Sequence, residues 1–394
     1  MTQTCKIAIA GLGVVGGGVI ELIERRHTAI AADCGIAIEI VGISAKNRTA
    51  KRPFDPDRYQ WYDNAVQMVQ QSYPDILIEA IGGTEGIALD AWTQAIENHC
   101  HIVTANKALL AVKGLHLARQ AQKNGVMIAY EAAVAGGIPI INCLSNAMWA
   151  NNITAVQGIL NGTCNYILSK MSETEQDFQT ALKDAQEKGF AEADPHFDVD
   201  GIDAAHKLTI LASLVFAEQP DFDGIDIQGI RDISPLDIRF AREMGYVLKL
   251  ISTVRLHDNG TIAKTVMPAM VARDDPLAHI SGVQNAVAIH SDALGCIMLE
   301  GPGAGAHATA SAIIADIVNV ARVKDNAANP VFLRKDLHRP KACDKTMQYN
   351  QFYLRMNVDD KPGVVASISS VMARHNVSIA NVTQHSRSAK MPES

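Results

Sequence analysis

The chain has 394 residues, of which 48 % are hydrophobic and 20 % are charged, and its formal net charge is -7. This length accommodates two or three domains, each with a core of its own. The negative balance and the lack of a dense Lys/Arg block argue against nucleic acid or an anionic membrane as the main partner. The cysteines are scattered without a C-x-x-C pair, the N-terminus lacks a signal-peptide pattern, and no apolar run is long enough for a membrane span. We therefore expect a soluble cytoplasmic protein.

Residues 1–145 alternate between strand-like and helix-like segments. An apolar strand at 6–10 leads through a glycine turn into a helix that extends to about Arg26. Further apolar, β-branched runs follow at intervals: "IAIEIVGIS", "DILIEAIGG", "HIVTAN" and "VMIAYEAAV". This alternation predicts an α/β fold with a doubly wound parallel sheet of the Rossmann type.

The glycine turn of this region has the G-x-G-x-x-G spacing, and it lies between a strand and a helix. That context gives the motif its meaning, because the glycines permit a tight turn and let the helix N-terminus approach a pyrophosphate. The sequence therefore predicts a dinucleotide-binding turn. Its residues are Gly11, Leu12, Gly13, Val14, Val15 and Gly16.

The loop after the second strand bears on the choice of cofactor. It carries Lys46, Arg48, Lys51 and Arg52, and no carboxylate stands where NAD-selective sheets place one. Cations there suit a 2′-phosphate, which favours NADP, with Lys46 and Arg48 as its ligands. A merely solvated basic loop is the alternative, and NAD stays open as a second cofactor.

Residues 146–325 have a different character. Strand-like runs at 153–160, 247–256 and 260–271 lie among helical segments, which predicts a separate α+β substrate and dimerisation domain. A second glycine turn then precedes a long helix within 303–325. We expect this helix to return to the nucleotide domain and to bring Gly303 close to the cofactor.

The segment "FAEADPHFDVDGIDAAHKLTILASLVFA" places a lysine at the entry of an apolar helix, with an aspartate one helical turn before it. An exposed ion pair between Asp203 and Lys207, four residues apart, is the ordinary interpretation. His206 points about 100° away from Lys207 on such a helix, so we expect it to lie behind the reactive groups.

Six motifs in the same order and spacing resemble homoserine dehydrogenase over about residues 5–325. They are "GLGVVG", "TANKALL", "EAAVAGGIP", "ILNGTCNYIL", "GFAEADPHFDVDGIDAAHKLTIL" and "GPGAGAHATASAIIADI". The resemblance implies reversible NAD(P)-dependent reduction of L-aspartate 4-semialdehyde to L-homoserine, in threonine, methionine and isoleucine biosynthesis. It also implies a homodimer or homotetramer.

The resemblance further implies roles for individual residues. Lys207 would exchange the proton with the substrate oxygen, and Lys107 would lie beside the cofactor. Glu192 and Asp203 would hold the substrate's ammonium group. The remaining implied positions are Thr163, Gly189 and Asp198 for the substrate, Ala105 and Gly303 for the cofactor, and Glu131 with the carbonyls of Val134, Gly136 and Ile138 for a monovalent cation such as sodium.

These roles agree with the chemistry of the reaction. Hydride addition to a carbonyl leaves negative charge on oxygen, so a cationic or acidic group must face that atom. A lysine in a shielded cleft beside another cation has a lowered pKa and exchanges protons near neutral pH. We therefore expect Lys107 and Lys207 to lower each other's pKa.

Two alternatives stay open. A semialdehyde dehydrogenase that forms a thiohemiacetal would need a nucleophilic cysteine, for which Cys164 is the candidate. A non-catalytic nucleotide or amino-acid sensor would keep the fold, but it would be expected to lose Lys107, Lys207 or Glu192, and all three are present.

The C-terminal part has its own pattern. Residues 326–349 are polar and irregular, which predicts a linker. Beyond them we expect a strand at 352–358, a turn at 359–363 and a helix from about Val364 to His375. This order resembles the first half of an ACT module, so residues 350–394 are interpreted as a partial regulatory segment.

Overall fold

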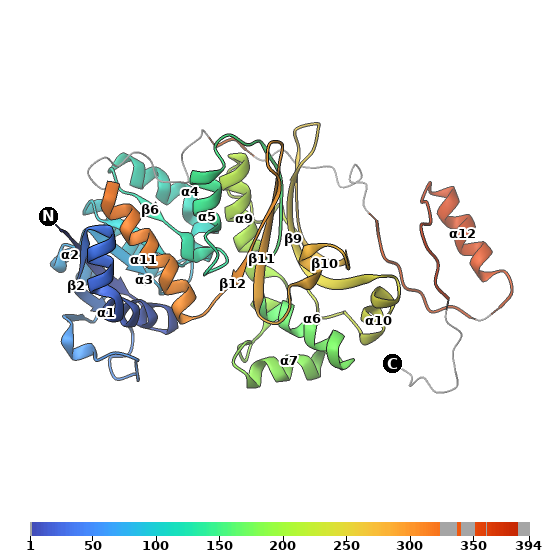
Figure 1. Cartoon of the computed structure of the whole chain (residues 1–394), viewed down its shortest axis with the longest axis horizontal. Coiled ribbons are helices and arrows are strands. Elements are labelled where there is room, and N and C mark those ends of the chain that lie inside the picture. Colours follow the sequence, from blue (N-terminus) through green and yellow to red (C-terminus); the bar gives the residue numbers. More distant parts are fainter. Residues whose placement is uncertain (1, 324–336, 340–350, 360, 385–394) are drawn as a thin grey trace. The chain divides into compact units, whose positions relative to one another are not determined.

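The computed structural model describes residues 2–323, 337–339, 351–359 and 361–384. The chain divides into two compact units, Met1–Gln348 and Tyr349–Ser394. The first unit contains two six-stranded sheets (Figure 1). The predicted linker at 326–349 falls almost wholly outside the described residues.

The first sheet is parallel and has the order β3-β2-β1-β4-β5-β6. Its strands are β1 (Gln3–Ala10), β2 (Ile36–Ser44), β3 (Trp61–Tyr62), β4 (Ile76–Glu79), β5 (His101–Thr104) and β6 (Ile128–Ala129). The predicted doubly wound sheet is confirmed. Only β3 was missed, because its two residues, unlike those of β6, do not lie within a longer apolar run. The strand order reverses between β1 and β4, and the carboxyl ends beside such a point form the usual dinucleotide crevice.

The sheet is flanked by helices that the alternation predicted. They are α1 (Val14–Cys34), α2 (Ala65–Ser72), α3 (Ile87–Glu97) and α4 (Lys107–Lys123). Helix α1 does not end near Arg26 as predicted. It runs on to Cys34 and ends at Gly35, whose φ of 72° is left-handed. The residues that follow Ile23 are mostly polar and lie at the surface, so the hydrophobic pattern did not predict that the helix continues.

Helix α11 (Ala306–Val323) is distant in sequence yet lies beside α1 (Figure 1). A Cβ atom at Gly18 would lie 2.8 Å from the carbonyl oxygen of Ala306, so only glycine permits this close approach. Ile313 and Ile317 of α11 are fully buried in the same core as Ile7 and Ile9 of β1. The helix thus belongs to the packing of the first sheet.

The second sheet has the order β12-β11-β7-β9-β10-β8 and is antiparallel except where β8 meets β10. Its strands are β7 (Ile153–Ile159), β8 (Asp226–Ile227), β9 (Tyr246–Leu256), β10 (Ile262–Ala272), β11 (Gln284–Ser291) and β12 (Gly295–Pro302). The helices of this part are α5 (Ile140–Asn142), α6 (Gly162–Thr174), α7 (Phe178–Glu187), α8 (His196–Val199), α9 (Ile202–Phe216) and α10 (Pro235–Glu243). Helices α6, α9 and α10 pack against β9.

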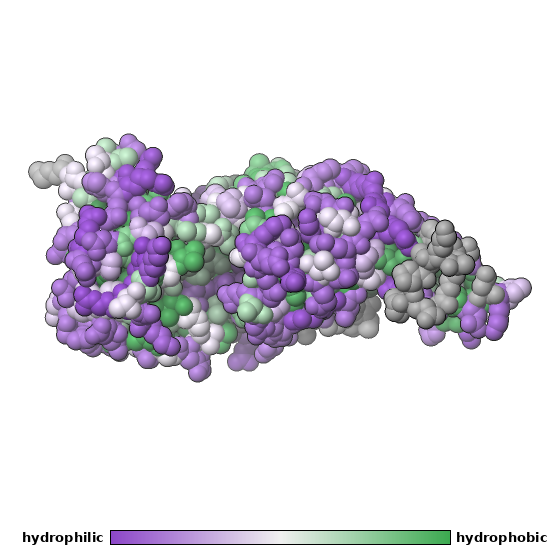
Figure 2. Space-filling view, turned by 90° about the horizontal axis from the view of Figure 1, so that it is seen from below, coloured by the Kyte–Doolittle hydropathy of each residue, from purple (hydrophilic) through white to green (hydrophobic). Residues whose placement is uncertain are grey.

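Figure 2 shows a largely hydrophilic surface with a recess between the parts of the first unit that hold the two sheets. Within the ranges that the structure describes, no helix combines the length and apolar character that crossing a bilayer requires.

The second unit contains helix α12 (Val364–Arg374), which confirms the predicted helix. It begins after Gly363, whose φ is 93°. The strand predicted at 352–358 is not observed: residues 351–359 adopt no regular secondary structure.

Candidate active site

The glycine turn between β1 and α1 has the geometry of a phosphate cradle. Gly11 has a φ of 95°, and a Cβ atom there would lie 2.4 Å from the carbonyl oxygen of Ala80. A Cβ at Gly16 would lie 1.8 Å from the carbonyl oxygen of Gly11. Gly13 faces open space, and no side chain caps the N-terminus of α1. The first amides of α1, at Val14 and Val15, are therefore accessible to an anion.

The other predicted cofactor positions lie on loops near the carboxyl ends of this sheet. Ala105 follows β5 directly, and its amide donates to the carbonyl of Glu79 (3.3 Å). Gly303 lies against the turn after β6, because a Cβ atom at Gly136 would come within 2.6 Å of its carbonyl oxygen. Both therefore stand at the edge where a dinucleotide binds in such sheets.

The basic loop after β2 is exposed and internally ordered. Arg52 donates to the carbonyl oxygen of Arg48 (2.9 Å), and the guanidinium carbons of Arg52 and Arg48 lie 5.3 and 5.7 Å from the ring centre of Trp61. Arg48 also forms a 3.4 Å ion pair with Asp57, and both side chains are largely exposed. Lys46 is exposed as well. The contacts of Trp61 were not evident from the sequence, because they depend on the unpredicted strand β3.

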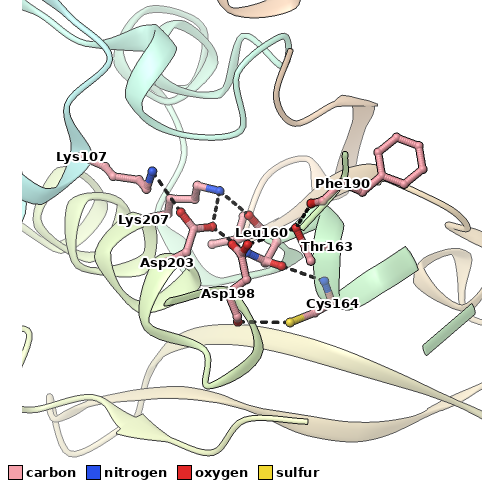
Figure 3. A network of polar contacts seen from close by, with 9 residues as sticks. Lys107, Leu160, Thr163, Cys164, Phe190, Asp198, Asp203 and Lys207 are labelled. Carbon is pink, nitrogen blue, oxygen red and sulfur yellow. Dashed lines mark hydrogen bonds and ion pairs between the residues drawn. The ribbon is translucent and has the colours of Figure 1, made fainter. Parts of the chain in front are cut away.

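The two lysines that the sequence singled out meet at one carboxylate (Figure 3). Lys207, in α9, donates to Asp203 Oδ2 (2.7 Å) and to the carbonyl oxygen of Leu160 (2.6 Å). Lys107, at the start of α4, lies 3.1 Å from Asp203 Oδ1. Only 8 % of Lys207 is exposed. The pair at Asp203 and Lys207 is therefore buried, so the ordinary interpretation of an exposed ion pair is wrong.

The electrostatics of this cluster follow from the position of Asp203. Burial alone would raise the pKa of Asp203, but the ammonium groups of Lys207 and Lys107 hold it below its usual range. Asp203 in turn raises the pKa of Lys107, against the effect of burial. The expectation that the two lysines lower each other's pKa is thus wrong for Lys107, because a carboxylate lies between the two cations.

A second carboxylate joins the cluster through an amide. Asn161 donates from Nδ2 to Asp198 Oδ1 (2.7 Å) and to Asp203 Oδ2 (2.9 Å). Thr163 donates to the carbonyl oxygen of Phe190 (2.7 Å) and lies 3.3 Å from Asp198 Oδ2. Burial raises the pKa of Asp198, while Asn161 opposes that shift. Sequence reasoning missed Asn161, although its place between a strand and a helix marked it as a helix cap.

Glu192 and Gly189 lie on the loop after α7. Gly189 has a φ of 74° there. The side-chain amide of Gln186 donates to the carbonyl oxygen of Glu192 (3.0 Å), which holds the loop. The carboxylate of Glu192 is exposed, and its charge contributes to the raised pKa of Lys107. Glu192 therefore lies close enough to act on the lysine cluster electrostatically.

Cys164 and His206 do not behave as reactive groups. Cys164 is fully buried and donates from Sγ to the carbonyl oxygen of Asp198 (3.2 Å). Burial and then the neighbouring carboxylates raise its pKa well above the usual value, so it stays a thiol and not a nucleophilic thiolate. His206 packs between Phe197 (5.3 Å) and Phe222 (4.7 Å), and burial lowers its pKa.

The predicted cation site lies in the turn after β6. Both carboxylate oxygens of Glu131 accept backbone amides at the start of α5, from Ile141 and Asn142 (2.8 Å each). Its own amide donates to Asp316 Oδ2 (2.8 Å). Burial raises the pKa of Glu131 to about 7 and that of Asp316 to about 8. Oxygen ligands such as these two buried carboxyl groups are the kind that a hard cation prefers.

A glycine cradle at a parallel sheet, beside a buried lysine–carboxylate–lysine cluster, defines the class of the protein. It is a nicotinamide-dependent oxidoreductase that acts on a CH–OH group. The chain belongs to the homoserine dehydrogenase family, because the family profile described as "Homoserine dehydrogenase" matches residues 139–318 and "Homoserine dehydrogenase, NAD binding domain" matches residues 11–131. The profile "ACT domain" matches residues 352–391.

Relatives support this assignment over nearly the whole chain. A homoserine dehydrogenase of Pseudomonas aeruginosa is 38 % identical over 389 residues, covering 96 % of this chain and 88 % of that protein. The crystal structure of a homoserine dehydrogenase from Thiobacillus denitrificans aligns with a TM-score of 0.84 at 36 % identity, covering 97 % and 89 % of the two chains. A hyperthermophilic archaeal homoserine dehydrogenase in complex with NADPH aligns with a TM-score of 0.70 at 28 % identity, covering 81 % and 98 %.

Proposed function

We propose that the cluster of Lys107, Asp203 and Lys207 carries the reversible reduction of L-aspartate 4-semialdehyde to L-homoserine. The observation that supports this proposal is the convergence of both lysines on one buried carboxylate, because two neighbouring cations would stabilise the alkoxide that forms during the reaction. The semialdehyde dehydrogenase alternative loses support, because its candidate nucleophile Cys164 is a buried thiol.

Lys207 is the proposed proton donor to the substrate oxygen. An ammonium group has three N–H donors, and two of those on Lys207 are directed at Asp203 and Leu160. The third remains for the carbonyl oxygen of the substrate, to which it gives a proton as the alcohol forms. When bound, the nicotinamide supplies the hydride. In the reverse direction the neutral amine takes the hydroxyl proton of homoserine.

The loop after α7 is the proposed site of substrate recognition. The exposed carboxylate of Glu192 is the proposed partner of the substrate's ammonium group. Asp203 was predicted to share that task, but both of its oxygens already face lysines, so we assign it mainly to holding them. Thr163, Gly189 and Asp198 stay proposed substrate-side positions.

NADP is the proposed preferred cofactor, with Lys46 and Arg48 near its 2′-phosphate. The support comes from the exposed cations that follow β2, where Ser44 ends the strand without a carboxylate. Arg52 and Trp61 would hold the loop in place. The NADPH complex of the archaeal relative agrees with this choice.

A monovalent cation such as sodium is the proposed occupant of the turn after β6. Glu131 and the carbonyls of Val134, Gly136 and Ile138 would hold it. Its positive charge would offset the buried carboxyl groups of Glu131 and Asp316 and would stabilise the turn against which Gly303 packs. We also propose that the chain assembles as a homodimer or homotetramer.

The test is a pair of spectrophotometric assays at 340 nm. NADP+ reduction is followed with L-homoserine, and NADPH oxidation is followed with L-aspartate 4-semialdehyde. Turnover in both directions supports the proposal, with L-serine and D-homoserine as controls for chain length and configuration. If neither direction shows turnover at millimolar substrate, the assignment to this reaction is wrong.

A further inference from the structure

The end of strand β7 holds both members of the buried ion pair. The carbonyl oxygen of Leu160 accepts from Lys207 (2.6 Å), and the side-chain amide of the next residue, Asn161, donates to Asp203 (2.9 Å). Leu160 and Asn161, which follow β7 directly, thus hold the cation and the anion of the same ion pair. Only 4 % of Asn161 is exposed, so water does not substitute for its amide.

The hydrogen bonds of Asn161 leave it a single orientation. Its Oδ1 accepts the amide of Cys164 (2.8 Å) in the first turn of α6, which requires the oxygen of the side chain on that side. Nδ2 then faces away from the helix, and its two N–H donors go to Asp198 (2.7 Å) and to Asp203. No donor is left over. The residue caps a helix with one atom and links two carboxylates with the other.

Two carboxylates drawn together in a buried cluster repel each other, and each repulsion favours protonation of one of them. The hydrogen bonds from Asn161 oppose this: they help to lower the pKa of Asp203, and they offset part of the rise that burial causes in the pKa of Asp198. Asp203 must be ionised, and turned correctly, if both lysines are to meet on it. The burial of the cluster makes the contribution of each such bond larger than it would be in water.

We propose that Asn161 is a positioning residue for the reaction: its amide holds Asp198 and orients Asp203 so that Lys107 and Lys207 converge. This inference rests on the proposed function, since it assigns a task within that site. It goes beyond helix capping, which is the ordinary role of an asparagine at this place.

The replacements Asn161→Asp and Asn161→Ser separate the two roles. Asp and Ser cap helices about as well as Asn, so a residue that only caps would tolerate both. Under our proposal both variants lose kcat by about 10- to 100-fold, because a hydrogen bond to a charged group is lost at the reacting site. We expect Asn161→Asp to lose more activity than Asn161→Ser, because it places a third carboxylate beside those of Asp198 and Asp203.

The pH profile is the readout that a purely structural role would not move. Without the amide the pKa of Asp198 rises, so the acidic limb of the kcat/KM profile moves to higher pH in Asn161→Ser. The matched control is Asn64→Asp, at the cap of α2, where Asn64 Oδ1 accepts from Val66 (2.8 Å). That variant keeps the wild-type kcat and profile.

If Asn161→Asp does not fold, as judged by circular dichroism, Asn161→Ser alone decides. A folded variant with wild-type kcat and an unmoved acidic limb overturns this inference and leaves the proposed function standing. A wild-type chain without homoserine turnover overturns both.

Discussion

The ammonium group of Lys107 lies 3.1 Å from the carboxylate of Asp203, which joins the first turn of α4 to the first turn of α9. One residue comes from the edge of the nucleotide-binding sheet and the other from the helix beneath the second sheet. The side chain of Asp203 is 8 % exposed, and that of Lys107 is 31 % exposed. The side chain of Lys107 is therefore the more accessible partner in this ion pair.

The first prediction concerns the proton. Lys207→Ala should lower kcat by ~10²- to 10⁴-fold, the range that a general acid or base contributes. The KM for NADPH should change little, because Lys207 is held by Leu160 and Asp203 and not by the glycine turn. Steady-state kinetics in both directions measure this. A kcat near that of the wild type would remove Lys207 from its proposed role.

The control for that variant is Lys249→Met. Lys249 is also a buried lysine, but it lies in β9 and donates to Asn165 Oδ1 (3.1 Å) and to the carbonyl oxygen of Ile280. We expect Lys249→Met to retain kcat within a few-fold of the wild type. Loss of activity in both variants would mean that any buried lysine is needed for folding, and it would contradict the specific assignment.

The second prediction concerns cofactor choice. Replacing Lys46 and Arg48 together by alanine should raise the KM for NADPH much more than the KM for NADH, because NADH lacks the 2′-phosphate. The control is the double variant Arg25→Ala, Arg26→Ala on the exposed side of α1. This variant also removes two positive charges, but at positions far from the N-terminus of α1, which faces the phosphates. Equal changes in both KM values would show that the loop is only solvated basic surface.

The sequence predicted those parts of the molecule that depend on local spacing. The glycine turn at Gly11–Gly16, the strands β1, β2, β7, β9 and β10 and the entry to α9 all have signals within about 20 residues. Strands β8, β11 and β12 were not predicted: β8 has only two residues, and the short apolar run at 286–289 does not distinguish a strand from a buried helix by periodicity. The six family motifs then placed the rest of the site by resemblance.

What the sequence could not supply were distances between residues far apart in the chain. The contact of Lys107 with Asp203 depends on how the two sheets meet, and so does the raised pKa of Lys107. Two lysines close together without that carboxylate would each lower the pKa of the other. Asn161 was missed for a similar reason, because its two acceptors lie in helices α8 and α9, which are distant in sequence.

The third prediction concerns stability against pH. Burial lowers the pKa of Lys249 to about 8, from 10.5 in the unfolded chain. Between these values the unfolded chain binds more protons than the folded one, so unfolding becomes less favourable as the pH rises. This difference corresponds to about 3 kcal/mol in the free energy of unfolding. Relative to Lys249→Met, the wild type should therefore gain stability from pH 8 to pH 10.5.

Urea unfolding at several pH values measures this difference. The comparison uses the gap between the two proteins, so the titration of other lysines and tyrosines cancels. A gap that stays constant across the range would show that Lys249 keeps its ordinary pKa. A gap that moves in the other direction would show a charged lysine stabilised by the fold.

The fourth prediction concerns the C-terminal unit. Helix α12 has no buried residue, and the segment before it exposes Phe352 (82 %) and Leu354 (60 %). Large apolar side chains in this number are typical of a surface that pairs with another chain. ACT modules usually pair, so we expect residues 350–385 to contribute to subunit association. Threonine should affect activity weakly, because the strand expected at 352–358 is not formed in the described residues of this unit.

Light scattering of a variant that ends at Ala342 tests the first part, and activity against threonine concentration tests the second. The matched variant Phe352→Ser, Leu354→Ser keeps the full length and removes only the exposed apolar groups. Because burying such side chains stabilises by about 1.5–3 kcal/mol each, their loss should shift the assembly toward a smaller species at micromolar concentration. An unchanged mass in both variants would place the association surface elsewhere, and strong cooperative inhibition by threonine would show that the segment forms a complete effector site in the assembled protein.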